Sequence, residues 1–199
     1  MGPAIAETAC AALLHYLDAM LDRNRQLNLT AVRKPEEAEI LHVLDSLALA
    51  LVDVNPQRCL EIGSGNGFPG VAAALLWPGS RVTLIERTQK KARAIEDLLA
   101  HSNIANAQVL QADAEQAPHL DPSLMKSFDL VLARALGTPQ KVERLSSPML
   151  ASNGILVLWA SASISPAEVL QDMELTDCID YRLPEPTARD RRLLIYQKP

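Results

Sequence analysis

The chain has 199 residues, of which 48% are hydrophobic, and a formal net charge of −5. This length suffices for a substantial core and predicts one structural domain. The negative charge argues mildly against a general polyanion binder, which needs a basic face. No apolar run approaches the roughly 20 residues that span a bilayer, and the N-terminus carries acids where a signal peptide has a basic start. We therefore expect a cytoplasmic protein without membrane contact.

The three cysteines, Cys10, Cys59 and Cys178, lie far apart and form no C-x-x-C pair. This spacing indicates neither a disulfide framework nor a zinc site. No other cluster of metal-ligating residues is evident from the sequence. We expect free thiols, no metal and a monomeric chain.

Two helical segments open the chain. Apolar residues at helical spacing predict a helix from Ile5 to about Asn24 and a second from Pro35 to about Val52. Pro35 is followed by Glu36 and Glu37, and both residue types are favourable in a first helical turn. We expect residues 1–54 to pack as a helical segment on a core formed by residues 55–199.

From Arg58 onward, short apolar runs alternate with helical ones. The predicted strands are Arg58–Ile62, Arg81–Glu86, Gln108–Gln111, Phe128–Ala133 and Ile155–Trp159, and the predicted helices are Pro69–Leu76, Lys90–Ser102 and Gln140–Leu150. Two further strand-like segments, 177–182 and 193–197, flank the linker-like stretch Leu183–Arg189. The alternation predicts an α/β fold with a mostly parallel sheet covered by helices on both faces.

A glycine-rich stretch, LEIGSGNGFPG, covers residues 60–70 at the end of the first predicted strand. Glycine lets a ligand approach the main chain, and open α/β sheets bind ligands at the carboxyl ends of their strands. Glu86 ends the next strand, 19 positions after Gly67, close to the spacing expected for a carboxylate that binds ribose hydroxyls. The pattern predicts a cleft for a nucleoside cofactor. The alternative is a glycine-rich turn without a ligand.

The glycine spacing is G-x-G-x-G with Glu61 two residues ahead, whereas dinucleotide-binding proteins show G-x-G-x-x-G/A. This acidic-glycine signature resembles that of class I S-adenosylmethionine-dependent methyltransferases. The resemblance implies S-adenosyl-L-methionine as the cofactor. It also implies a Rossmann-like fold with a mostly parallel seven-stranded sheet, in which one antiparallel strand is inserted near the edge.

Further motifs narrow the resemblance. They are Asn28-Leu29-Thr30, His42-Val43-Leu44-Asp45-Ser46-Leu47, Gly63-Ser64-Gly65-Asn66-Gly67-Phe68-Pro69-Gly70, Ala133-Arg134-Ala135 and Arg191-Arg192-Leu193. In this order, and over nearly the whole chain, they resemble the glucose-inhibited division protein B (RsmG) family. The resemblance implies transfer of a methyl group to N7 of a guanosine in a decoding-region loop of 16S ribosomal RNA, with that RNA or the small ribosomal subunit as partner.

The resemblance also assigns roles to matching residues. Glu61, Gly63, Gly65, Gly67, Phe68, Glu86, Ala114, Glu115 and Arg134 would bind the cofactor. His42, Asp45 and Arg134 would act at the reaction centre, and Asn28, Ser46 and Arg191 would bind the substrate. Guanine N7 has no proton to lose, so this chemistry needs alignment rather than a base.

Simpler interpretations stand beside these roles. Asn28 and Thr30 are suited to capping a turn, and Asp45 with Ser46 to fixing a helix end. His42 is equally compatible with a satisfied core position. Arg134 is harder to explain without a cleft, because an arginine that ends an apolar strand must be paired or solvated.

Four positions depart from the family pattern: Arg23, Leu41, Asp113 and Ala160 stand where Trp, Arg, Arg and Lys are common. Three cationic clusters remain, at residues 23–34, 87–93 and 189–192. The departures keep open a noncatalytic or differently targeted S-adenosylmethionine-binding protein, and a small-molecule methyltransferase is a further alternative.

Overall fold

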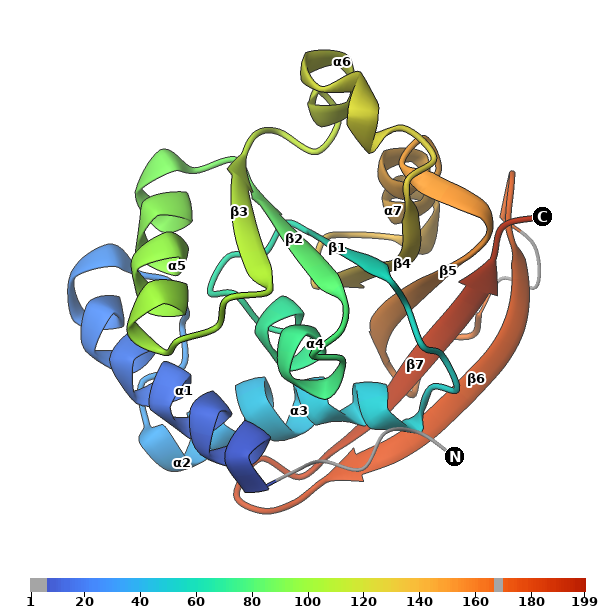
Figure 1. Ribbon diagram of the computed structural model, residues 1–199. Coiled ribbons are helices and arrows are strands. Elements are labelled where there is room, and N and C mark those ends of the chain that lie inside the picture. Colours follow the sequence, from blue (N-terminus) through green and yellow to red (C-terminus); the bar gives the residue numbers. More distant parts are fainter. Residues whose placement is uncertain (1–6, 167–169) are drawn as a thin grey trace.

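The computed structural model describes residues 7–166 and 170–199, and its centre is a seven-stranded sheet in the order β3-β2-β1-β4-β5-β7-β6 (Figure 1). The strands are β1 Arg58–Ile62, β2 Arg81–Glu86, β3 Ala107–Gln111, β4 Phe128–Arg134, β5 Leu150–Ser161, β6 Glu174–Leu183 and β7 Arg189–Gln197. The first five strands pair in parallel, and β7 is antiparallel to both of its neighbours. The predicted α/β fold, with an inserted antiparallel strand, is therefore confirmed.

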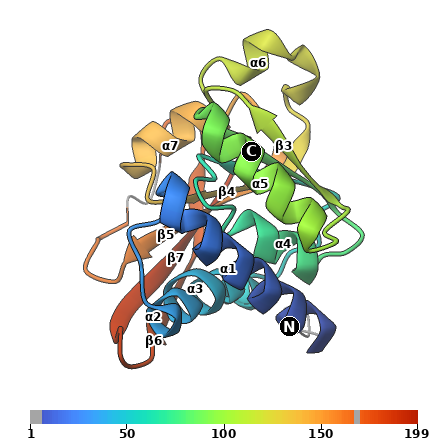
Figure 2. The same cartoon turned by 90° about the vertical axis from the view of Figure 1, so that its left-hand side faces the viewer.

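Helices cover both faces of this sheet (Figures 1 and 2). The helices are α1 Glu7–Leu27, α2 Pro35–Ala38, α3 Asp45–Leu47, α4 Gly70–Leu76, α5 Gln89–His101, α6 Ala117–Leu120 and α7 Pro139–Ser146. Side chains alternate along each strand, so that Leu130 and Leu132 of β4 join the core under α1, α4 and α5, while Val131 and Ala133 join the core under α7. The near-continuous apolar strands thus reflect burial on both faces.

The segment predicted as one helix from Pro35 to Val52 is not regular. It passes from α2 into a π-helical turn, Glu39–Leu44, then into α3 and a 3-10 turn, Ala48–Leu51. The N–H of Asp45 bonds to the carbonyls of Ile40 and His42, and not to that of Leu41, its α-helical partner. The prediction of a continuous helix was wrong because side-chain periodicity does not report the hydrogen-bonding pattern.

Other boundaries also differ from the prediction. β5 begins at Leu150, where the helix Gln140–Leu150 was expected to end, and α7 already ends at Ser146. The linker-like stretch Leu183–Arg189 is the tight connection of a β6–β7 hairpin, with its first and last residues paired to each other. Pro and Glu composition there marks a turn and not a hinge between domains.

α1 rests on α4 and α5 and shares their core. Leu13, Leu17 and Met20 of α1 are almost fully buried and belong to the same apolar cluster as residues of α4 and α5. Within the described ranges, none of the helices combines the length and apolar character that crossing a membrane requires. The packing places the segment after α1 over the carboxyl ends of β1 and β4.

Candidate functional site

Two cavities meet at the carboxyl edge of the parallel strands. The first, of about 380 Å³, lies between the π turn, the end of β4 and the start of β7. The second, of about 460 Å³, lies between the ends of β2 and β3 and helix α7. Gly63 and Gly65 line both cavities, so the glycine loop, residues 63–70, forms the wall between them.

The loop conformation depends on glycine. Gly63, Gly65 and Gly67 all have positive φ, at 72°, 57° and 91°. A Cβ on Gly67 would collide with the Tyr16 hydroxyl, whereas one on Gly65 would make only an ordinary contact with the Gly63 carbonyl oxygen, at 3.9 Å. The loop is held to β2 because the N–H groups of residues 63 and 64 donate to the Ile85 carbonyl, at 2.9 and 3.0 Å.

Glu86 lies at the end of β2 and lines the second cavity, as do Ala114 and Glu115. Its carboxylate accepts hydrogen bonds from the N–H groups of Gly65 at 2.9 Å and Thr88 at 2.7 Å. Glu115 is exposed and forms an ion pair with Arg144 at 3.2 Å. The structure therefore brings together the residues predicted for the adenosine end of a cofactor.

Glu61 and Gly67 are the two predicted cofactor residues that line neither cavity. Glu61 is 1% exposed. Its carboxylate accepts the N–H of Gly70 at 2.9 Å, and burial raises its pKa to about 8. Glu61 therefore supports the end of the glycine loop at the start of α4 and does not face either cavity.

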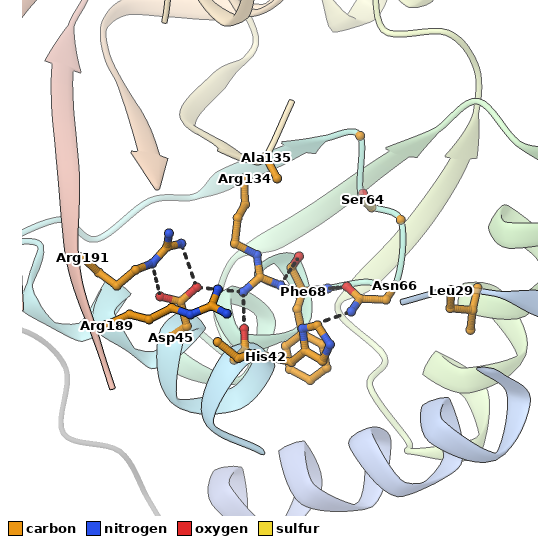
Figure 3. A pocket seen from close by; sticks show the side chains of 13 residues that line it. Leu29, His42, Asp45, Ser64, Asn66, Phe68, Arg134, Ala135, Arg189 and Arg191 are labelled. Atoms are coloured by element: carbon orange, nitrogen blue, oxygen red, sulfur yellow. Dashed lines mark hydrogen bonds and ion pairs between the residues drawn. The ribbon is translucent and has the colours of Figure 1, made fainter. Parts of the chain in front are cut away.

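Asp45 is the centre of a buried polar cluster in the first cavity (Figure 3). Its Oδ2 accepts hydrogen bonds from Nη1 of Arg134 and Nη2 of Arg191, both at 3.1 Å. Its Oδ1 accepts Nε of Arg191 at 3.1 Å and the Tyr181 hydroxyl at 2.5 Å. The Asp45 side chain is only 3% exposed, so two guanidinium groups and a phenol replace its water.

Arg134 connects the π turn to the glycine loop. Its Nη1 also donates to the Leu41 carbonyl at 2.9 Å, and its Nη2 donates to the Phe68 carbonyl at 3.1 Å. The side chain is 13% exposed, which agrees with the expectation that it must be paired at the cleft. Arg134 thereby fixes the distance between two segments that line the first cavity.

His42 faces the first cavity from the π turn but is already bonded at both nitrogens. The Asn66 side-chain oxygen accepts the Phe68 N–H, so its amide nitrogen faces Nδ1 of His42 at 3.3 Å. Nε2 then carries the proton and donates to the Thr30 hydroxyl at 3.0 Å. Burial and the nearby Arg134 lower the pKa of His42 to about 4, so the ring is neutral near pH 7.

Three predicted residues contribute little surface to the cleft: Asn28 and Ser46 line neither cavity, and Phe68 lines the first but is buried. Asn28 has a φ of 51° directly after α1, and its N–H donates to the Asn24 carbonyl at 3.4 Å, which caps the helix end. Its side-chain oxygen accepts a hydrogen bond from Nη2 of Arg33 at 2.8 Å. Ser46 is fully buried with its hydroxyl 3.5 Å from Arg134. Phe68 is 2% exposed, and its ring packs on His42 and Tyr16, so little of it is free to stack on a base.

Several site residues were not identified from the sequence. Leu29, Ser64, Asn66, Ala135 and Arg189 also line the first cavity. Tyr181 bonds Asp45, and the Trp159 indole donates to the Asp45 carbonyl at 2.9 Å. Asn66 lies within the glycine motif and was open to prediction, but the roles of Tyr181 and Trp159 arise only from strand pairing.

The departures and cationic clusters are distributed unevenly. Leu41 lines the first cavity and Asp113 the second, whereas Arg23 pairs with Asp97 at 3.1 Å across α1 and α5. Ala160 lines neither of them. Arg87 and Lys91 reach the second cavity, and Arg189 and Arg191 reach the first. Two of the three clusters therefore contribute to the cleft.

Across the described ranges, no group of His, Cys, Asp or Glu is arranged to hold a metal ion.

The first cavity is cationic although the chain is acidic. Arg134, Arg189 and Arg191 face a single carboxylate, that of Asp45, which leaves a surplus of two positive charges among its described lining residues. Such a surface favours a polyanionic ligand.

Comparisons with known proteins agree with this geometry. A model of the GidB family, described as rRNA small subunit methyltransferase G, matches residues 9–192. A protein named ribosomal RNA small subunit methyltransferase G from Psychrobacter sp. is 34% identical over 86% of this chain and 76% of its own length. A protein of the same name from Acinetobacter baumannii is 29% identical over 100% of this chain and 93% of its own length.

Solved structures show the same fold. A predicted O-methyltransferase from Agrobacterium tumefaciens, Atu636, superposes with a TM-score of 0.58 over 79% of this chain and 80% of its own, at 23% identity. The extent of the family match and the identity to its curated relatives lead to one conclusion. The chain belongs to the rRNA small subunit methyltransferase G (GidB) family.

Proposed function

We propose that this protein transfers a methyl group from S-adenosylmethionine to N7 of a guanosine in a decoding-region loop of 16S ribosomal RNA. The observation that carries the proposal is the cationic first cavity, which opens against the glycine loop and contains three arginines and one carboxylate. An RNA loop supplies the phosphates that such a cavity attracts. It also supplies an unstacked base that a cleft of this size admits.

The cofactor would occupy the two cavities on either side of the glycine loop. Glu86 is placed to bind the ribose hydroxyls in the second cavity, next to Ala114 and Glu115. Gly63 and Gly65 line both cavities, so the glycine loop would hold the cofactor with its methyl group accessible from the first cavity. Family membership supports methyltransferase chemistry, and the acidic-glycine loop supports S-adenosylmethionine as its donor.

S-adenosylmethionine would supply an electrophilic methyl group for direct displacement, in which the guanine N7 lone pair forms the bond to the methyl carbon as the bond from carbon to sulfur breaks and its electron pair stays on sulfur. Positive charge would pass from the sulfonium to the purine without movement of a proton, so the reaction would require no base from this chain. His42 fits this chemistry because its neutral ring is bonded to Thr30 and Asn66 and is not needed as a base.

In this scheme Arg134, His42 and Asp45 shape the reaction centre by position. Arg134 fixes the glycine loop relative to the π turn, and Asp45 fixes Arg134 and Arg191. Alignment of the acceptor with the sulfonium then accounts for the rate enhancement. Ser46 supports Arg134, and Asn28 supports the turn that carries Leu29 into the cavity.

The test is transfer of labelled methyl from S-adenosylmethionine to small ribosomal subunits and to their deproteinised RNA, followed by mapping of the modified base. Label at guanine N7 in the decoding-region loop is the expected result, and the better acceptor identifies the physiological substrate. Cofactor binding without transfer to either RNA would overturn the proposal in favour of a noncatalytic or differently targeted binding protein. Transfer to a small molecule alone would point to a different substrate class.

A further inference from the structure

The start of β7 extends beyond its neighbour at the edge where the cleft lies. β5 ends at Ser161, which pairs with Arg191, whereas β7 begins two residues earlier at Arg189 and pairs there only with Leu183 of β6. Because β7 is antiparallel to β5, this overhang lies past the carboxyl end of the sheet. Arg189 and Arg191 are two positions apart and share one side of the strand, and both line the first cavity.

A further hollow of about 610 Å³ continues from this point. We call it the hairpin groove, and it is lined by Ser161, Ala162, Ser163, Arg189, Asp190 and Arg191. Arg189 and Arg191 line both the groove and the first cavity, so the two spaces border the same side chains. Its wall carries the Ser161 and Ser163 hydroxyls, which lie 2.9 Å apart.

Arg189 differs from its charged neighbours in having no counter-charge. Arg191 is paired with Asp45, Arg192 with Asp180 at 2.5 Å, and Asp190 with Arg182 at 2.7 Å. The exposed Arg189 side chain forms no ion pair or hydrogen bond with the residues that the structure describes. Figure 3 shows it extending from the hairpin into the cavity that also holds Arg134 and His42.

A free guanidinium beside hydroxyl donors fits a phosphate. The planar guanidinium fork matches two phosphate oxygens, and the bond is stronger when both partners are charged. We propose that the hairpin groove binds the RNA phosphodiester next to the nucleotide that enters the first cavity, with Arg189 as its cationic contact. This inference rests on the proposed function and assigns the path of the RNA backbone at that site.

The experiment compares Arg189→Ala with Arg81→Ala. Arg81 is also the exposed first residue of a strand, but β2 begins at the opposite edge of the sheet, away from the cleft. Both variants lose one positive charge. Binding of a small-subunit RNA fragment is measured from low to moderate salt, together with KM and kcat for the RNA and the affinity for S-adenosylmethionine.

For Arg189→Ala we expect the KM for RNA to rise roughly tenfold, with kcat and cofactor affinity unchanged. The slope of log affinity against log salt should fall by about one charge equivalent, as for loss of a single phosphate contact. Arg189→Lys should restore the slope but only part of the affinity, because an ammonium does not bind two oxygens at once. Ser163→Glu, which puts a carboxylate into the groove, should weaken RNA binding further.

Equal behaviour of Arg189→Ala and Arg81→Ala in both KM and salt slope would overturn the inference. So would normal RNA affinity for Ser163→Glu. If the wild-type protein methylates no RNA, the proposed function fails, and the binding measurements alone then decide on the groove. Failure of one proposal is therefore distinguishable from failure of the other.

Discussion

The glycine loop and the Asp45 cluster lie on the same cleft, but they derive their shapes from different kinds of interaction. The loop is a continuous stretch whose backbone N–H groups bond to Ile85 and Glu86. The cluster joins side chains that lie 89 and 146 positions from Asp45 along the chain. The comparison teaches that the glycine loop, the proposed cofactor side, depends on backbone conformation, whereas the Asp45 cluster, on the proposed substrate side, depends on a buried charge and its partners.

The largest effect is expected for Asp45→Ala, which removes the centre of the cluster. Arg134 and Arg191 would keep buried charges without a carboxylate, so the free energy of unfolding should fall by about 3–5 kcal/mol. Methyl transfer should be lost, while the second cavity should still bind S-adenosylmethionine. Urea denaturation measures the free energy of unfolding, and titration calorimetry measures the binding of S-adenosylmethionine.

Asp180→Ala is the matched control, because it breaks the ion pair to Arg192, in which the aspartate is 58% exposed. Exposed pairs contribute little to stability, so this variant should remain close to the wild type. An Asp45→Ala protein that is as stable as Asp180→Ala would contradict the view that the cluster holds this end of the cleft.

Gly67→Ala tests the loop in the same way. The substitution forces a Cβ into the Tyr16 hydroxyl at a φ of 91°, so strain and steric overlap should together cost about 3 kcal/mol. Cofactor affinity should fall more than RNA affinity. Gly65 also has a positive φ, but a Cβ there would clash with nothing, so Gly65→Ala should cost only about 1 kcal/mol. Equal costs for the two variants would show that Tyr16 does not constrain the loop.

Glu61→Gln separates the effect of the Glu61 charge on stability from that of the hydrogen bond by which Glu61 supports the loop. The pKa of Glu61 rises from about 4.5 in the unfolded chain to about 8 in the folded protein. The folded state therefore holds a proton that the unfolded state releases between these values. This stabilising contribution is complete below about pH 4.5 and is lost as the pH rises toward 8.

The slope of that loss is at most about 1.4 kcal/mol per pH unit. Glutamine keeps an oxygen for the Gly70 N–H and cannot ionise, so the variant should gain stability relative to the wild type from pH 5 to pH 8. Unfolding free energies measured across this range test the prediction. Parallel curves for the two proteins would mean that Glu61 is ionised throughout.

Apart from the two control variants, Asp180→Ala and Gly65→Ala, the smallest effect is expected for Tyr181→Phe. It removes one hydrogen bond to the buried Asp45 carboxylate but leaves both arginines in place, so the cost should be about 1.5 kcal/mol. Thermal unfolding measures it, and methyl transfer should fall only modestly. A loss of stability as large as that of Asp45→Ala would show that the Tyr181 phenol, and not the Asp45 carboxylate, is the main support of the cluster.

The sequence predicted the local structure around the glycine loop better than the contacts of the Asp45 cluster. β1 and β2 have their predicted bounds because their apolar runs end abruptly at turns, and Arg58 to Glu86 form one local βαβ unit. Asp45 and Arg134 were singled out by motif resemblance, but their ion pair depends on tertiary packing. Tyr181 gave no signal, since only the pairing of Tyr181 with Arg191 between β6 and β7 brings it to Asp45.

The π turn at Glu39–Leu44 has a consequence for the gene. A π turn contains one residue more than an α-helical turn, so it is equivalent to a one-codon insertion within a helix. Because the Asp45 N–H bypasses the Leu41 carbonyl, that carbonyl is available to Arg134. A one-codon deletion within this turn would restore a regular helix and rotate Asp45 by about 100° relative to the residues before the turn. An in-frame loss of three nucleotides would thus break the contacts of Asp45 with Arg134 and Arg191, although every side chain of the Asp45 cluster would still be encoded.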